Sequence, residues 1–433
     1  MNPEGDKTSD GDGFADLYLE RHAFYDRFID EVPEPDTSVI VVIPCYNEPD
    51  ILDSVVSLFN ADRPSLPVEV IVVVNTPEIA PDESKEQNKQ TVFKIREWGA
   101  KYNSPDFRVH VMDVDPFPAR HAGAGFARKT GMDEAVRRFN LLNNENGIIV
   151  SFDADSICDA NYFTELEKCL LVNKFKGCTI YFEHPLEGDE ESGGIYEAVA
   201  LYELYLRFFI QALRLTGFPW AFHTIGSCFA VNAKVYTAQG GMNRRKAGED
   251  FYFLHKVFPL GSFTELNTTR VVPSARESDR VPFGTGPAIV KYTKGDRALL
   301  RTYSLSSFEE LSEMFDKIPE IYNKGGKELD EILYQLPGCI GTFLSNHGFN
   351  AAIQQMSMHS ASLVTFRKRF FTWFSAFRII KFLNYAREYC HGDQLLAEAA
   401  GQLVNNKGAD KCCDIKGLLF QYRRLQKEIV WIC

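Results

Sequence analysis

The stretch IIVSFDADSI, residues 148–157, decides the fold of this chain. Four of its first five residues are β-branched or aromatic, which is typical of a strand that is buried on both faces. At the carboxyl end of this run the chain places Asp153 and Asp155 one residue apart, with no Lys or Arg beside them. Two carboxylates at the tip of a buried strand indicate a site rather than a surface turn.

Similar apolar runs precede this stretch and set the fold class. SVIVVI at 38–43 and VEVIVVV at 68–74 predict two further strands of a parallel sheet. Between them, residues 47–60 have the cap residue, early proline and apolar spacing of a helix. The strand–helix–strand pattern repeats over 107–152. We therefore expect an α/β fold with a mostly parallel central sheet and right-handed crossovers.

Composition and charge divide the chain into three expected regions. Residues 1–37 are an acidic extension, expected to be mobile at first and then helical over 14–32. Residues 1–36 hold eleven acids and three bases, which accounts for eight of the twelve net negative charges. Residues 38–290 form the α/β domain, which ends near the Gly/Pro-rich segment 281–287. Residues 291–433 lack β-branched runs and are expected to form a helical C-terminal domain.

The composition also excludes some classes of function. An apolar share of 45% and a charged share of 24% are ordinary for a soluble globular protein. Outside the acidic extension the charges nearly balance, so a nucleic-acid partner is not expected. The ten cysteines show no zinc-type spacing, and the start MNPEGDKTSD lacks the features of a signal peptide. No apolar run is long enough for a membrane span, so we expect a reduced, cytoplasmic setting.

Polar clusters follow three of the predicted strands. In an open α/β sheet, ligands bind outside the carboxyl ends of the strands. PCYNE at 44–48 follows the first strand, Asn75 ends the second, and Asp153 and Asp155 follow the one quoted above. Converging carboxylates suit Mg²⁺ or Mn²⁺, which takes its remaining ligands from substrate phosphates and water. The alternative is that these acids cap a helix or hold a turn.

Two further charged pairs are candidates. Arg128 and Lys129 follow Gly123 and Gly125, and as cations near the first turn of a helix they could neutralise a diphosphate. The alternative for them is solvated surface charge.

Glu249 and Asp250 begin an apolar helical pattern. They either stabilise the helix dipole or supply a general base for an acceptor hydroxyl. Trp220 and His223 could line an acceptor pocket or be ordinary core residues.

Five motifs occur in an order that resembles the family 2 glycosyltransferases of the glycosyltransferase A fold, over about 38–287. They are VVIPCYNE, VEVIVVVN, FDADS, GSCFAVN and GEDFYF. The resemblance implies a catalytic domain over 38–290. It also implies a role for each matching position: Pro44, Tyr46 and Glu48 at the nucleoside, Asn75 at the base, Asp153 at the ribose or metal, Asp155 on the metal, and Asp250 as the base.

The sequence departs from the family in two places. Val74 and Asn75 stand where an acidic pair is usual, and an amide both donates to and accepts from a base edge, so a UDP- or GDP-sugar is expected. The Q-x-x-R-W motif of processive synthases is missing. The hypothesis is metal-dependent transfer of one sugar from the donor to a hydroxyl acceptor, either a small molecule or a lipid-linked glycan. The transfer is expected to invert the anomeric configuration, with Asp250 as the base. The alternatives are a retaining enzyme resembling the glycosylglycerate synthases and a catalytically silent nucleotide-sugar-binding protein.

A basic, aromatic stretch stands out in the acidic chain. TFRKRFFTWFSAFRIIKF at 365–382 carries five positive charges, no negative one, and an apolar face at helical spacing. One interpretation is an interfacial helix that lies on anionic lipid near a lipid-linked acceptor. The alternative is a helix whose aromatic face packs in the protein core.

Overall fold

The protein is described by a computed structural model that covers residues 13–118, 122–188, 194–245, 248–278, 280, 284–405 and 414–433. The expected mobile start and residues 281–283 of the Gly/Pro-rich segment lie outside these ranges. Contacts divide the chain into two compact units. The first takes residues up to Tyr181 together with Thr224–Leu254 and Thr268–Pro273. The second takes Phe182–His223, His255–Asn267 and Ser274–Cys433.

This division differs from the sequence-based boundary at residue 290. Helix α6 (Ile195–Leu215) precedes that boundary but belongs to the second unit. It packs there against α10 (Leu305–Asp316) and α18 (Ile415–Glu428). Its apolar residues are buried on most sides, so its packing partners, rather than its place in the sequence, decide the unit to which it belongs.

The eight strands of the main sheet confirm the expected α/β class. They are β1 Val39–Cys45, β2 Val68–Pro77, β3 Phe107–Phe117, β4 Ile148–Ser151, β5 Ser156–Cys158, β6 Gly177–Phe182, β7 Phe229–Asn232 and β8 Phe263–Pro273. The order across the sheet is β3-β2-β1-β4-β7-β6-β8-β5. Strands β3, β2, β1 and β4 are parallel, whereas β7 runs antiparallel to both β4 and β6. Strands β1 and β4 are fully buried except at Pro44, as their continuous apolar runs predict.

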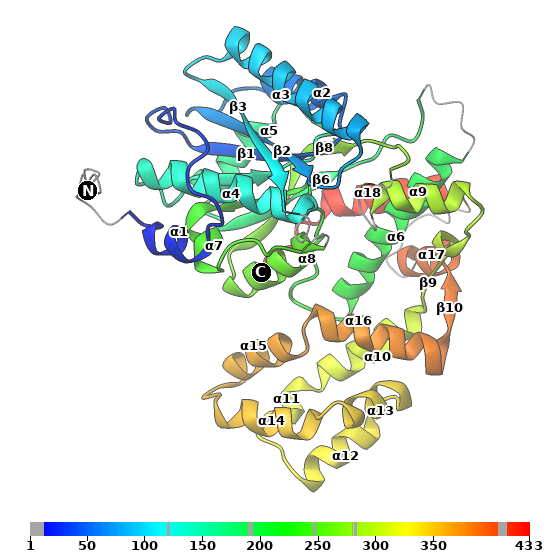
Figure 1. The fold of residues 1–433 in the computed structure, drawn as a ribbon. Helices are drawn as coiled ribbons and strands as arrows, with labels where there is room; N and C mark the ends of the chain where they lie inside the picture. The colour runs from blue at the N-terminus through cyan, green and yellow to red at the C-terminus, as the bar shows by residue number, and fades with distance from the viewer. Residues whose placement is uncertain are drawn as a thin grey trace. The chain divides into compact units, whose positions relative to one another are not determined.

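Helices cover both faces of the parallel strands (Figure 1). The helices of the first unit are α1 Asp16–His22, α2 Ile51–Asn60, α3 Asp82–Tyr102, α4 Ala124–Leu141, α5 Tyr162–Glu167, the π-helix η1 Lys168–Val172, α7 Ala233–Ala238 and most of α8 Glu249–Val257, whose last three residues belong to the second unit. Helices α2 and α3 lie on one side and α4 on the other. A β-carbon at Gly131 of α4 would stand 2.5 Å from Val42 Cγ1, so only glycine lets this helix approach β1 so closely.

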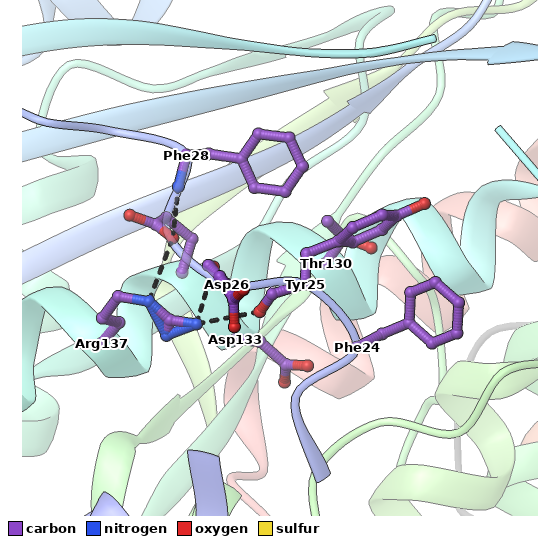
Figure 2. A pocket seen from close by; sticks show the side chains of 8 residues that line it. Phe24, Tyr25, Asp26, Phe28, Thr130, Asp133 and Arg137 are labelled. Carbon is purple, nitrogen blue, oxygen red and sulfur yellow. Dashed lines mark hydrogen bonds and ion pairs between the residues drawn. The ribbon is translucent and has the colours of Figure 1, made fainter. Parts of the chain in front are cut away.

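The helix expected over residues 14–32 is wrong beyond His22. Residues after Ala23 run in a non-helical path along α4, and their backbone groups find partners there. Figure 2 shows Arg137 of α4 donating to the carbonyl oxygens of Tyr25 and Asp26, at 3.0 and 2.8 Å. Because side chains of α4 replace the intrahelical hydrogen bonds, the aromatic spacing of this segment does not produce a helix.

The part of the second unit within residues 291–433 is helical, as expected, with one small exception among the described residues. Besides α6, α10 and α18, the helices of the second unit are α9 Thr285–Thr293, α11 Ile318–Ile321, α12 Lys327–Gln335, α13 Gly338–Asn346, α14 Phe349–Met358, α15 Leu363–Trp373, α16 Ala376–Ala386, α17 Leu396–Asn405 and the short η2 Phe258–Leu260, η3 Ala298–Leu300 and η4 Arg387–His391. The exception is an antiparallel pair of strands, β9 Arg301–Tyr303 and β10 Asp393–Leu395, which the sequence did not predict.

The aromatic stretch 365–382 forms two helices rather than one. Helix α15 ends at Trp373 and α16 begins at Ala376. The side chains of Phe366, Phe370 and Phe374 are fully buried within the second unit. This burial favours the core-packing interpretation over a lipid-facing aromatic stripe. Within the described ranges, no helix has both the length and the apolarity needed to cross a membrane.

Candidate active site

The predicted site lies where the strand order reverses. From β1 the chain moves to β2 and β3 on one side, and β4 then adds on the other side of β1. Ligands of open α/β sheets bind at such a switch point, outside the carboxyl ends of the strands. The segment 44–48 leaves the end of β1, and Asp153 and Asp155 follow the end of β4. The topology therefore brings the first and third predicted clusters to neighbouring strand ends.

Arg128 joins the two acidic motifs through its guanidinium group. Its Nη2 donates to Asp153 Oδ1 at 2.6 Å, and its Nη1 forms an ion pair with Glu249. The Arg128 and Glu249 side chains are only 4% and 5% exposed, whereas Asp153 is 37% exposed. One buried cation thus connects the end of β4 to the start of α8. The sequence-predicted residues Arg128, Asp153 and Glu249 come together here.

Two glycines make room for this ion triad. A β-carbon at Gly125, in the first turn of α4, would stand 2.2 Å from the Arg245 carbonyl oxygen and 2.9 Å from Glu249 Cγ. A β-carbon at Gly226 would stand 2.8 Å from Arg128 Nη2. Gly125 lies inside α4, and close packing at this position requires glycine.

Carboxylates and a guanidinium act in opposite directions at this site. Glu249 and Asp153 act on Asp250, and Asp155 and Glu249 act on Asp153, while Arg128 opposes them in both cases. Burial and the neighbouring Glu249 charge together raise the pKa of the Asp250 carboxyl from 3.8 to about 7, although Arg128 opposes both. Burial likewise raises the pKa of Asp153, again against Arg128. Repulsion between neighbouring carboxylates of this kind favours a bound cation or proton.

The chemistry of the donors at the end of β4 fits a divalent metal. Asp153 Oδ1 is engaged by Arg128, and the carboxylate is accessible enough to offer its other oxygen. Asp155 is partly exposed two residues further on, at a turn closed by the hydrogen bond from Ser156 N to Asp153 O. Mg²⁺ and Mn²⁺ sites commonly use one or two carboxylates and complete their shell with substrate oxygens and water. Asp153 and Asp155 could hold such an ion.

The ends of β1 and β2 are joined by Asn88, which the sequence analysis missed. Asn88 lies in α3 and is 1% exposed. Its Oδ1 accepts from Asn47 N at 2.8 Å, and its Nδ2 donates to Thr76 Oγ1 at 2.9 Å. This amide fixes the segment that carries the predicted nucleoside residues. The signal in the sequence would have been a helical pattern over residues 82–102 with Asn88 on the same face as Val92 and Ile95.

The remaining residues predicted to contact the nucleotide lie on either side of Asn88. Pro44 and Tyr46 are partly exposed at the end of β1, but Glu48 is 1% exposed. Asn75, near the end of β2, is also buried, at 3% exposure. The carbonyl oxygen of Glu48 accepts from Thr91 Oγ1 of α3 at 3.3 Å. Because Glu48 and Asn75 are buried, both side chains contribute to the packing of these strand ends.

Lys129 does not join the ion triad. Its Nζ donates to Asp133 Oδ2 at 2.7 Å, and its side chain is 4% exposed. Tyr18 and Tyr236 donate their hydroxyl groups to the other oxygen of Asp133, at 2.7 and 3.1 Å. Lys129 therefore belongs to a separate buried network that fastens the N-terminal segment to α4.

Trp220 and His223 belong to the second unit, where both are buried. Trp220 packs edge-on against Phe218 and Phe371, and His223 packs edge-on against Phe182. Burial and the nearby Arg207 and Arg214 charges hold the pKa of His223 well below its usual range. Their environment is that of core residues, which was the alternative weighed for them.

No protein-family model matches the sequence, and no curated protein sequence is similar to it. Among solved structures, residues 1–349 of S. aureus TarS in complex with UDP-GlcNAc share 14% identity over 90% of this chain and 91% of that one, with a TM-score of 0.38. The same fragment in complex with UDP gives 14% identity, 90% of each chain and a TM-score of 0.34. GalNAc-T7 with UDP, GalNAc and Mn²⁺ gives 12% identity over 72% of this chain and 54% of that one, with a TM-score of 0.34. Because every TM-score is below 0.5, these likenesses carry no weight for function.

Proposed function

We propose that this chain is a glycosyltransferase that moves a single sugar from a nucleotide-sugar donor to a hydroxyl acceptor. The observation that carries the proposal is the ion triad Asp153–Arg128–Glu249 at the switch point of the sheet. It brings the two acidic motifs of the family resemblance together, with Asp155 and Asp250 beside them in the sequence. The order of the five sequence motifs adds to this support.

Asp250 is the proposed general base. Transfer with inversion needs a group that accepts the acceptor's hydroxyl proton as the oxygen attacks the anomeric carbon. A base works best when its pKa lies near the operating pH, and burial raises the pKa of Asp250 to about 7. Its Oδ1 accepts from Phe251 N at 2.7 Å, which orients the carboxyl group at the start of α8. Glu249 is turned into the ion pair with Arg128, so we assign it a positioning role.

The donor's diphosphate is the proposed ligand of the acidic strand end. Asp153 and Asp155 would hold Mg²⁺ or Mn²⁺, which when bound offsets negative charge on the leaving nucleoside diphosphate. Arg128 holds Asp153 in place and lowers the local negative charge. The segment at Pro44 and Tyr46 would meet the nucleoside, and the amide of Asn75 suits a UDP- or GDP-sugar.

Two alternatives make different predictions. In a retaining transferase, Asp250 would orient the acceptor without deprotonating it, and the product would keep the anomeric configuration of the donor. A catalytically silent binding protein would bind the nucleotide-sugar and release no nucleoside diphosphate. The raised pKa of Asp250 supports the transferase over the silent binding protein. An acid that only stabilises the start of a helix does so when it is ionised, so a raised pKa does not serve that role.

The test is a donor screen on the purified full chain. UDP- and GDP-sugars are supplied with Mn²⁺, with Mg²⁺ or with EDTA, and nucleoside diphosphate release is measured with a mixture of hydroxyl acceptors. We expect metal-dependent release with one donor and its loss in Asp155→Ala. NMR of the product's anomeric proton distinguishes inversion from retention. Donor binding without release across the acceptor panel would establish the silent alternative.

A further inference from the structure

A cluster of metal-binding side chains lies in the second unit, away from the residues discussed so far. Glu310, Cys339 and His391 bring their ligating atoms within 4.8 Å of one another. No other three His, Cys, Asp or Glu side chains in the described part of the chain meet this spacing. The three residues come from α10, the first turn of α13 and the end of η4.

Cys390, the disulfide partner of Cys339, can supply a fourth donor once the disulfide is reduced. It forms a disulfide with Cys339, and the two Cα atoms are 6.3 Å apart. It also precedes His391 in the sequence, so both approach the cluster from η4. Cys339 is buried, whereas Cys390 is exposed and His391 is half-buried. A reductant or a metal ion in solution can therefore reach the cluster from the η4 side.

The carboxylate is already oriented toward the other donors. Glu310 Oε1 stands 2.7 Å from His391 Nε2, and Glu310 Oε2 accepts from Ile340 N at 2.8 Å. One oxygen therefore caps α13 while the other faces the imidazole. A second partner that fixes the orientation of a ligand is typical of protein metal sites.

We propose that Glu310, Cys339, Cys390 and His391 form a zinc site that assembles when the disulfide is reduced. Thiolate, imidazole and carboxylate are the ligands that Zn²⁺ takes in proteins, and four of them complete a tetrahedral structural site. The oxidised chain instead holds the disulfide beside a Glu310–His391 hydrogen bond. The same four side chains would thus cross-link α10, α13 and η4 in either state.

The movement required of the imidazole and the carboxylate is small. With zinc bonds of about 2.0–2.1 Å and tetrahedral angles, the liganding N and O atoms stand about 3.3 Å apart. The imidazole and carboxylate therefore separate by about 0.6 Å from their present 2.7 Å. The two sulfur atoms must move apart to about 3.8 Å, the separation of two thiolates on one zinc ion.

The exchange balances with a dithiol as the reductant. The dithiol transfers two electrons and two protons to the Cys339–Cys390 disulfide and itself becomes a cyclic disulfide. The two protein thiols then release their protons as their sulfur atoms bind Zn²⁺. Attack is expected at Cys390, the exposed partner of the pair.

The experiment compares oxidised and reduced full-length chain, with the dithiol removed by gel filtration before metal is added. Zn²⁺ is counted by equilibrium dialysis, and Co²⁺ serves as a spectroscopic substitute. Cobalt bound by thiolate gives a charge-transfer band that an all-oxygen site at Asp153 and Asp155 cannot give. We expect one thiolate-bound Co²⁺ per reduced chain and none per oxidised chain.

Variants test whether the cobalt band comes from this site rather than from other cysteines, and whether weaker binding reflects a lost ligand rather than misfolding. Cys339→Ser and His391→Gln should weaken cobalt affinity of the reduced chain at least about tenfold, the lower end of what losing even an outer-shell partner costs. Glu310→Gln keeps an oxygen for the Ile340 amide, so it should fold normally and still bind cobalt more weakly. The matched control is Cys433→Ser, a half-buried free cysteine of the same unit, which should bind like wild type. A reduced wild-type chain without the band, a band that survives Cys339→Ser, or equal binding by the oxidised chain would overturn the proposal.

Discussion

The pH dependence of transfer gives the sharpest test of Asp250. Burial and the neighbouring Glu249 charge raise its pKa to about 7 from an ordinary value of 3.8. A general base must be ionised, so activity should be lost as the pH falls below about 7. With that pKa, about 9% of the carboxyl groups are ionised near pH 6 and about 91% near pH 8. We therefore expect kcat/KM of the free enzyme to rise about tenfold over this interval.

Three variants show whether the profile belongs to Asp250. Asp250→Asn should lower kcat about 100-fold or more and remove the acid limb. Glu249→Gln removes a charge that raises the pKa of Asp250, so its acid limb should move to lower pH. Arg128→Gln removes a cation that lowers this pKa, so its limb should move to higher pH, although loss of a buried ion partner also destabilises the chain by about 3–5 kcal/mol.

The assay is nucleoside diphosphate release at subsaturating donor with fixed metal, over a buffer series from about pH 5 to about pH 9. A flat wild-type profile, or one that Glu249→Gln leaves in place, would refute the reasoning.

The same pKa has a consequence for stability. The folded chain keeps the Asp250 proton between about pH 4 and about pH 7 while the unfolded chain releases it, so the free energy of unfolding should fall as pH rises through this window. Asp250→Asn should remove that dependence and raise the melting temperature above pH 7, even as activity is lost. Equal melting temperatures for variant and wild type near pH 8 would show that Asp250 is not forced to ionise in an unfavourable site.

Three other predictions follow from the structure. Asp155→Ala should abolish metal-dependent binding of nucleoside diphosphate in calorimetry while leaving the melting temperature near wild type, and unchanged affinity would remove Asp155 from the metal site. Asn88→Ala should lower the free energy of unfolding by about 1–3 kcal/mol, because it leaves the Asn47 amide without its partner, whereas Gln90→Ala on the exposed side of the same helix should change little. Segment 365–382 should not bring the chain down with anionic vesicles even at low salt, because its aromatic face is packed; binding that fades as salt rises would support the interfacial interpretation.

The sequence predicted the elements that carry strong local patterns. The β-branched runs gave β1, β2 and β4 with both faces covered, and strand ends located Asp153 from the sequence alone. Where a pattern depended on spacing alone it failed, as in 14–32, because partners from α4 decide that segment's conformation.

Residue identity alone could not show how charges pair. Arg128 and Lys129 are adjacent and were given one role, yet successive residues of a helix point about 100° apart. One therefore reaches the acidic strand end, and the other enters the Asp133 network. The disulfide between Cys339 and Cys390 was also missed, because the two are 51 residues apart and nothing in their spacing marks them as partners.

Two of the buried ion clusters, those around Glu203 and Arg128, differ in how their surroundings shift the pKa values of their carboxylates. In the second unit, Glu203 is one carboxylate among Arg207, Arg423 and His184, and the Arg207 charge with hydrogen bonds from the others holds its pKa well below the usual range despite burial. Every charge there has a partner, which suits a rigid core.

Around Arg128 the carboxylates behave differently. Burial and neighbouring carboxylates raise the pKa of Asp153, and the pKa of Asp250 rises to about 7, although Arg128 opposes both. A fold gains no stability from an acid that resists ionisation, so a site arranged in this way is explained by what it binds or by the proton it accepts. The raised pKa of Asp250 beside the ion triad, rather than any single acidic motif, is therefore the strongest physical reason to look for catalysis in the first unit.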